Sequence, residues 1–159
     1  MIEGLTPLLA ALEASEIAQA VRSSRWSYAA VSGAHVLGIG LLVGAIVPLD
    51  LRLLGLWRRI DHVTLSRVLV PAAALGLVLA ACTGVLLFSV RAQRYATYDI
   101  VAVKLSLIVT GAALALLLHA RAGLWLERAT ARQAWWHGAA SLGCWLGALS
   151  CGRLIAYVG

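Results

Sequence analysis

Charged side chains are scarce in this sequence. They make up 13% of its 159 residues, with seven carboxylates against thirteen lysines and arginines. A soluble domain carries about a quarter charged residues, whereas 62% of this chain is hydrophobic. The deficit excludes an ordinary soluble globular domain and indicates a membrane protein.

The sequence also lacks the motifs of common soluble enzymes. It has no phosphate-binding P-loop, no GxGxxG fingerprint, no HExxH zinc motif and no credible serine triad. Its three cysteines form no CxxC pair and no secreted disulfide pattern, so we expect them to be buried as small hydrophobic side chains. Two matching halves, which would indicate a transporter repeat, are also lacking.

Four long apolar runs are present, at residues 27–49, 67–90, 99–119 and 134–158. Each is long enough to cross the roughly 30 Å hydrocarbon layer as a helix. Together they use almost the whole chain, so residues 1–159 are predicted to form a single membrane domain. We therefore predict an all-α integral membrane bundle of four helices with up-and-down topology.

The segment 1–25 precedes the first run and carries three glutamates where a secretory leader would be basic, so we do not expect a signal peptide. Thr6 and Pro7 are typical of a helix N-cap followed by proline at the first helical position. We predict a short amphipathic helix from there to about Ser23, lying at the membrane interface.

The formal charge of +6 does not indicate a nucleic-acid partner, because the basic residues lie in short loops between the runs. Such a distribution is a topology signal and suits contact with anionic membrane lipids. The first and third loops, with Arg67, hold seven arginines, and the opposite side holds five. The positive-inside rule then predicts a bacterial inner (cytoplasmic) membrane protein with both termini in the periplasm.

His35 is the one strongly polar side chain between Tyr28 and Leu49. An ionisable side chain in mid-span is costly in hydrocarbon, usually faces other helices and often belongs to a functional site. Gly38 lies one turn later on nearly the same face, where a small residue admits either a neighbouring helix or a flat ligand. A merely packed His35, hydrogen-bonded across helices, is the competing interpretation.

Depth along the helices separates the polar residues into two layers. His35 and Lys104 lie about nine and six residues into parallel spans, within roughly 5 Å of the same depth. Thr83 lies at a similar depth in the second span. His119 and His137 lie near the opposite rim. For Lys104, snorkelling to the interface is the alternative to a place in the deep layer.

The deep layer has the residue types that haem requires, because haem iron in a bundle takes one or two inward imidazoles with small residues beside them. His35 is the first candidate for an axial ligand, with Gly38, Thr83 and Lys104 shaping the pocket. His119 and His137 form a candidate bis-histidine site at the other end.

Copper is the alternative metal. Cys144 and Cys151 lie seven residues apart on one helical face, and Cu(I) prefers thiolate and thioether ligands. Met1 is the only methionine in the sequence, which argues against a copper conduit.

The order of these residues resembles a known family. A histidine followed by small residues (35–40) precedes a basic loop, Thr83-Gly84, two loop tyrosines and Lys104-Leu105. This order is similar to the four-helix unit of the copper-resistance D (CopD) family and of HemJ-type protoporphyrinogen oxidases, which are membrane haem proteins. The segment 50–55 also resembles one in small bacterial membrane proteins of unknown function. Over residues 26–120, the resemblance implies that His35 is a haem or metal ligand.

These observations predict a membrane-embedded, cytochrome b-like protein that holds haem b. It would move electrons between a quinone, or another membrane carrier, and a partner protein. Two alternatives stay open. One is a non-catalytic accessory subunit of a larger membrane complex or homo-oligomer, assembled through small-residue motifs such as Gly40-Gly44. The other is a copper-uptake component of CopD type.

Overall fold

The computed structural model describes residues 4 and 6–158, and within them every regular element is a helix. The all-helical prediction is confirmed. In chain order the helices are α1 (Thr6–Glu13), α2 (Glu16–Ser23), α3 (Arg25–Leu53), α4 (His62–Ser89), α5 (Ala92–Ala96), α6 (Asp99–Ala122) and α7 (Ala131–Val158).

Three of these helices, α3, α4 and α6, are long and apolar enough to cross a membrane. The helix α7 has the same length as α4, 28 residues, but falls outside this group. Polar side chains such as Gln133, His137 and Ser141 recur along its first half and dilute its apolar character. Many large apolar side chains on the long helices are exposed, for example Leu116 at 71% and Val109 at 67%. A lipid environment would cover such faces.

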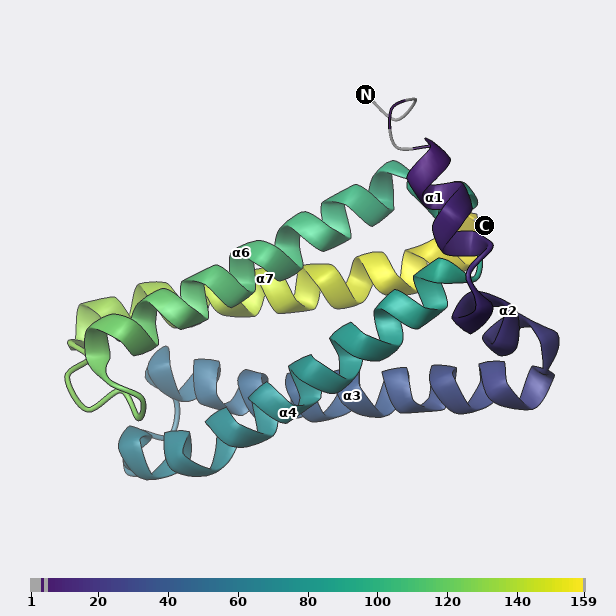
Figure 1. The fold of residues 1–159 in the computed structure, drawn as a ribbon. Helices are drawn as coiled ribbons and strands as arrows, with labels where there is room; N and C mark the ends of the chain where they lie inside the picture. The colour runs from purple at the N-terminus through teal and green to yellow at the C-terminus, as the bar shows by residue number, and fades with distance from the viewer. Residues whose placement is uncertain (1–3, 5, 159) are drawn as a thin grey trace.

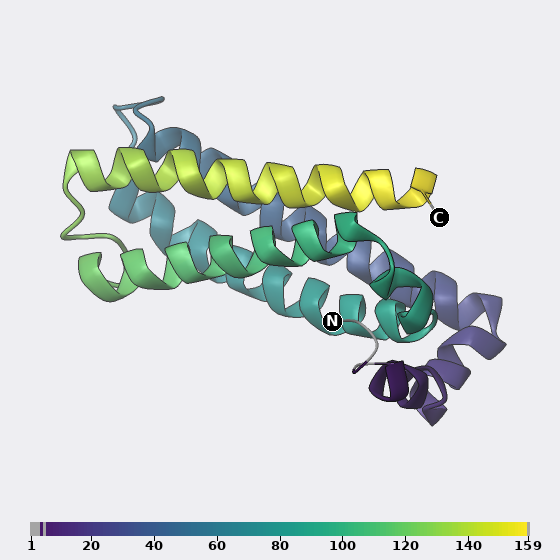
Figure 2. The ribbon, with the colours of Figure 1, turned by 90° about the horizontal axis from the view of Figure 1, so that it is seen from above.

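The long helices form two antiparallel hairpins, α3 with α4 and α6 with α7 (Figure 1). The hairpins meet where α3 packs on α7, and α4 makes no contact with α6 in the part of the chain that the structure describes. The loops that close the two hairpins lie at one end, and α1, α2 and the end of α7 lie at the other (Figures 1 and 2).

Glycines permit the closest of these helix contacts. A Cβ at Gly38 would lie 2.7 Å from the backbone nitrogen of Ala80, and a Cβ at Gly76 would collide with the backbone of Leu42. Between the hairpins, a Cβ at Gly138 of α7 would lie 2.9 Å from the Asp50 carbonyl oxygen of α3. Small residues therefore set how closely the backbones approach, as in other membrane bundles.

Polar caps make the helices begin earlier than the apolar runs predict. The Ser24 hydroxyl accepts hydrogen bonds from the backbone N–H groups of Trp26 and Ser27, so α3 begins at Arg25. The Asp61 carboxylate accepts from the Thr64 backbone N–H at 2.8 Å, so α4 begins at His62 and the preceding loop is shorter than predicted. Such caps satisfy N–H groups that have no partner within the helix.

The N-terminal segment forms two short helices where one was predicted. Ser15 interrupts it, because its hydroxyl donates to the Leu12 carbonyl at 2.7 Å and accepts from the Ala18 N–H at 3.3 Å. The side chain of Ser15 thus ends α1 and caps α2. Glu13 then ties α1 to α5 by accepting hydrogen bonds from Gln93.

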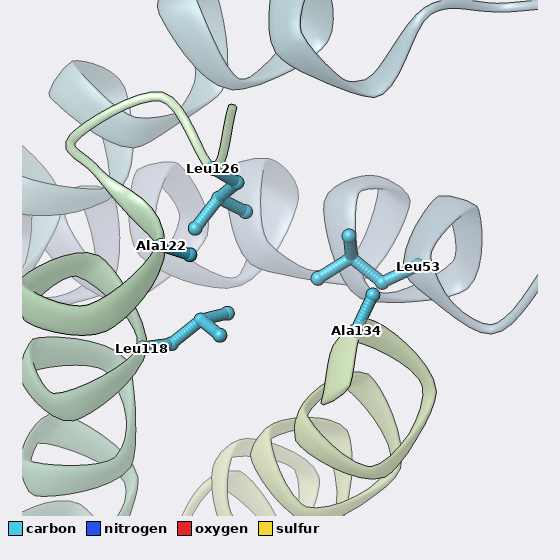
Figure 3. Close-up of a cluster of buried hydrophobic side chains, with 5 residues drawn as sticks. All are labelled: Leu53, Leu118, Ala122, Leu126 and Ala134. Atoms are coloured by element: carbon cyan, nitrogen blue, oxygen red, sulfur yellow. The ribbon is translucent and has the colours of Figure 1, made fainter. Parts of the chain in front are cut away.

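A small apolar cluster closes the loop end of the hairpins (Figure 3). It comprises Leu53, Leu118, Ala122, Leu126 and Ala134, which come from α3, α6, the α6–α7 loop and α7. Leu126 is 1% exposed and has a positive φ of 62°, which is unusual for a side chain of this size. His62 at the start of α4 hydrogen-bonds to its carbonyl oxygen at 3.2 Å, so this loop is tied to the other hairpin.

Candidate functional site

The deep polar layer is built on a contact between α3 and α4. Nδ1 of His35 lies 3.0 Å from the Thr83 hydroxyl oxygen. That hydroxyl donates its single proton to the Leu79 carbonyl one turn earlier, at 2.6 Å. Toward the imidazole the hydroxyl therefore acts as an acceptor, and Nδ1 of His35 carries the proton. The neutral ring is left with its lone pair on Nε2, the form in which histidine binds a metal.

Space for this ring comes from Gly84. A Cβ at Gly84 would lie 3.1 Å from Cε1 of His35, so a larger residue would press directly on the imidazole. Thr83 and Gly84 therefore act together, one orienting the ring and the other making room for it. The Thr83-Gly84 pair is the wall against which His35 packs.

Lys104 approaches the same layer from the other hairpin. It lies within electrostatic range of His35 and of Cys151. Its ammonium group would be 3.2 Å from a Cβ at Gly152 of α7. The side chain therefore extends inward from α6 toward α7 and α3. The predicted grouping of His35, Thr83 and Lys104 corresponds to this arrangement.

Gly38 was predicted to admit either a neighbouring helix or a flat ligand. In the structure, a neighbouring helix, α4, occupies the space beside it. Gly38 is buried against the backbone of α4 at Ala80 and Gly76, which leaves no space for a flat ligand at that point.

His119 and His137 lie together between α6 and α7, within electrostatic range of each other. In the part of the chain that the structure describes, Nδ1 of His119 and Nε2 of His137 are both buried without a hydrogen-bond partner. Buried polar atoms are nearly always paired, so each such atom requires an explanation such as a bound ligand. This pair is the second candidate position for a cofactor.

The two candidate positions are far apart. Asp50 lies fifteen residues after His35 on α3, about 22 Å along the helix, and it packs beside Gly138, the neighbour of His137. His35 and the His119–His137 pair therefore lie at different depths of the bundle.

Asp50 is a polar residue whose position the sequence did not reveal. It is 5% exposed and lies at the contact between α3 and α7. Ser141 of α7 is its polar neighbour, and Oδ2 has no hydrogen-bond partner among the described residues. The available signal was a carboxylate directly after an apolar run, a position that often proves functional in membrane helices.

The cysteines do not converge on one point. Cys82 is exposed on α4, Cys144 packs near Gly111 of α6, and Cys151 lies near Lys104. Among the described residues, no group of three or more histidines, cysteines and carboxylates is arranged to hold a metal ion. A haem requires fewer protein ligands than that, because one or two axial side chains hold its iron.

No protein-family model, curated protein or solved structure matches this chain.

Proposed function

We propose that the chain is a multi-pass protein of a bacterial inner membrane in which α3, α4, α6 and α7 form a four-span bundle. The helix α7 is as long as α4 and packs along α6, which supports its role as the fourth span despite its polar first half. The helices α1 and α2 would lie at the membrane interface. The arginine count of seven against five favours termini in the periplasm.

Within this bundle we propose a cytochrome b-like site that holds haem b, with His35 as an axial ligand. The observation that carries the proposal is the hydrogen bond from His35 to Thr83, which leaves the lone pair on Nε2. Ligating histidines are typically held in this way by a second hydrogen bond that fixes the tautomer and the ring orientation. A bound haem would supply one-electron redox chemistry for transfer between a quinone and a partner protein.

The surrounding residues have definable parts in such a site. Thr83 orients the imidazole, and Gly84 makes room for it. Lys104 places an ammonium group beside the same layer, where it can pair with a carboxylate of the cofactor. His119 and His137, each with an unpaired buried nitrogen, are the candidates for a second haem.

The test is an absorption spectrum of protein purified in detergent from haem-replete cells, recorded oxidised and then dithionite-reduced. A Soret band with sharp reduced α and β bands is expected. His35→Ala should abolish or shift these bands. His62→Ala is the matched control, because His62 hydrogen-bonds to the Leu126 carbonyl outside both candidate sites. A featureless spectrum in the wild-type protein, or full haem loading with an unchanged spectrum in His35→Ala, would overturn the assignment.

One observation favours a second function, that of an accessory subunit in a larger membrane complex or homo-oligomer. Gly33, Gly40 and Gly44 of α3 have open space where a Cβ would lie, so no helix among the described residues covers the Gly40-Gly44 motif. Co-purification of a partner that is lost in Gly40→Leu would support this function. Stoichiometric copper without haem would instead support the CopD-type alternative.

A further inference from the structure

Asp50 is a buried acidic side chain that the haem proposal does not use. It lies on α3, three residues before the helix ends at Leu53, and it is 5% exposed. Its polar neighbour on α7 is Ser141, which is also 5% exposed. Oδ2 of Asp50 has no hydrogen-bond partner in the part of the chain that the structure describes. Nearly all buried polar atoms are paired, so this oxygen requires an explanation.

Asp50 lies where the two hairpins meet. Among the described residues, α3 and α7 are the only helices of different hairpins whose backbones come into contact (Figure 1). A Cβ at Gly138 of α7 would lie 2.9 Å from the Asp50 carbonyl oxygen and 3.1 Å from Cβ of Leu53. The two helices are thus as close here as the missing side chain of Gly138 allows. Asp50 is therefore part of the contact that holds the hairpins together.

The carboxyl group of Asp50 has no charged partner among the described residues. The charged and titratable side chains at this end of the surrounding helices are Arg52 on α3, His62 and Arg67 on α4, His119 and Arg121 on α6, and Arg132 and His137 on α7. None of them has an electrostatic interaction with Asp50. Arg52, the nearest in sequence, donates instead to the carbonyl oxygens of Ile60 and Arg58. His137 hydrogen-bonds to the backbone of Leu114 on α6.

A proton on this carboxyl group would remove the charge from the contact. A neutral carboxylic acid is much less costly to bury than a carboxylate, because an unpaired ion loses its hydration. We propose that Asp50 is a proton-binding site that stabilises the contact between the hairpins when it is protonated and weakens this contact when the proton leaves. Carboxyl groups inside membrane bundles commonly carry protons. The proposal requires neither His35 nor a haem.

The proton would be exchanged with water at the loop end of the bundle. The end of α3 is only three residues, or about 4.5 Å along the helix axis, beyond Asp50. Leu53 occupies that end, packs against Gly138 and belongs to the apolar cluster (Figure 3). Exchange therefore requires the contact between α3 and α7 to open, which links the movement of the proton to the packing of the hairpins.

The first test compares the thermal unfolding of the wild-type protein and Asp50→Asn in one neutral detergent, from mildly acidic to mildly alkaline buffer. Asparagine stays neutral, so both proteins should unfold at similar temperatures in acid. The midpoint of the variant should exceed that of the wild type by about 2–4 °C in alkaline buffer, where the wild type buries a carboxylate. Asp99→Asn, which changes an exposed aspartate at the start of α6, is the matched control and should show no such trend.

Infrared difference spectra between the same buffers detect the proton itself. The carbonyl stretch of a protonated carboxylic acid should be lost from the wild-type protein as the pH rises. Asp50→Asn should lack this change, and Asp99→Asn should retain it. A midpoint difference that does not vary with pH, or spectra without a band that depends on Asp50, would overturn the proton site. A lower midpoint for Asp50→Asn at every pH would assign the carboxylate to a bound cation instead.

Gly138→Ala tests the link to the hairpin contact. Its added Cβ would press on the Asp50 carbonyl oxygen and so force α3 and α7 apart. In this background Asp50 should be hydrated, and the advantage of Asp50→Asn in alkaline buffer should largely disappear. The comparison is made between two proteins that both carry Gly138→Ala, so a general loss of stability cancels. An undiminished advantage would overturn the link between the proton and the packing of the hairpins.

Discussion

Thr83 accepts a hydrogen bond from Nδ1 of His35 at 3.0 Å while its own hydroxyl proton goes to the Leu79 carbonyl at 2.6 Å. The two residues are 48 positions apart and belong to different helices. Their contact determines which imidazole nitrogen is protonated, and so which one faces the proposed cofactor site.

Replacing Thr83 with valine should weaken haem binding by about 10- to 100-fold, the usual effect of removing the group that orients a ligating histidine. Valine keeps the branched shape but cannot accept the hydrogen bond. Thr83→Ser keeps the hydroxyl and is the control. Titration of apoprotein with haemin, followed at the Soret band, measures the difference. Equal affinity in the valine and serine variants would rule out the orienting role.

The close contact between α3 and α4 predicts opposite effects for two glycines. Gly76→Ala should destabilise the protein by about 1–3 kcal/mol, because the added Cβ collides with the backbone of Leu42. Gly40→Ala, in open space on the same hairpin, should be neutral or stabilise by up to about 1 kcal/mol through helix propensity. Thermal unfolding in a fixed detergent compares them. A destabilised Gly40→Ala would indicate that a partner covers that face.

We expect the carboxylate of Asp50 to lower the free energy of unfolding relative to a neutral amide at the same position. It is 5% exposed, and its Oδ2 has no hydrogen-bond partner among the described residues. Asp50→Asn should therefore raise stability at neutral pH by about 1 kcal/mol, since a neutral group is less costly to bury. Asp99→Asn, at an exposed helix start, should change little. A stability loss in Asp50→Asn would show that the carboxylate has a partner, such as a bound cation or water.

The Asp61 cap of α4 should make the first turn of that helix sensitive to acid. Hydrogen bonds from the backbone N–H and then the hydroxyl of Thr64 hold the pKa of Asp61 below its ordinary value of 3.8. A carboxylate whose pKa is lower in the folded protein than in the unfolded chain contributes its full stabilisation above pH 3.8. This stabilisation is lost as the pH falls through the pKa of the folded protein. Hydrogen exchange at the Thr64 amide, corrected for intrinsic rates, should therefore accelerate only below pH 3.8.

Asp61→Asn is the matched control for this effect, because asparagine also caps helices but does not titrate in this range. Its Thr64 amide should exchange at a corrected rate that does not vary with pH. Acid-dependent exchange of the same size in Asp61→Asn would assign the effect to another group.

Much of the helical framework was predictable because it depends on local sequence. The apolar runs of 21 to 25 residues correspond to the long helices. Ser24 and Asp61 start two of these helices, because each side chain accepts hydrogen bonds from backbone N–H groups of the first turn that follows it. The break at Ser15 was missed, although it is also local. Serine occurs inside helices as well as at their N-caps. Only the hydrogen bond from the Ala18 backbone N–H to the Ser15 hydroxyl identifies Ser15 as an N-cap.

The candidate site was predictable in depth but not in detail. His35, Thr83 and Lys104 could be placed in one layer because a helix rises by a fixed amount per residue. The direction in which each side chain points could not be obtained in this way. Gly38 packs against α4 and Gly40 faces open space, although they are two residues apart. One residue turns a helix by about 100°, so a small error in rotation moves a side chain to another face.

The sequence by itself determined that this protein is helical and where its four long helices lie, because these properties follow from the apolar runs and from contacts within about four residues. The tertiary structure alone decided that Thr83 orients His35 and that Asp50 is buried beside Ser141. Such pairings join helices far apart in the chain, and they depend on how each helix is rotated and packed against its neighbours.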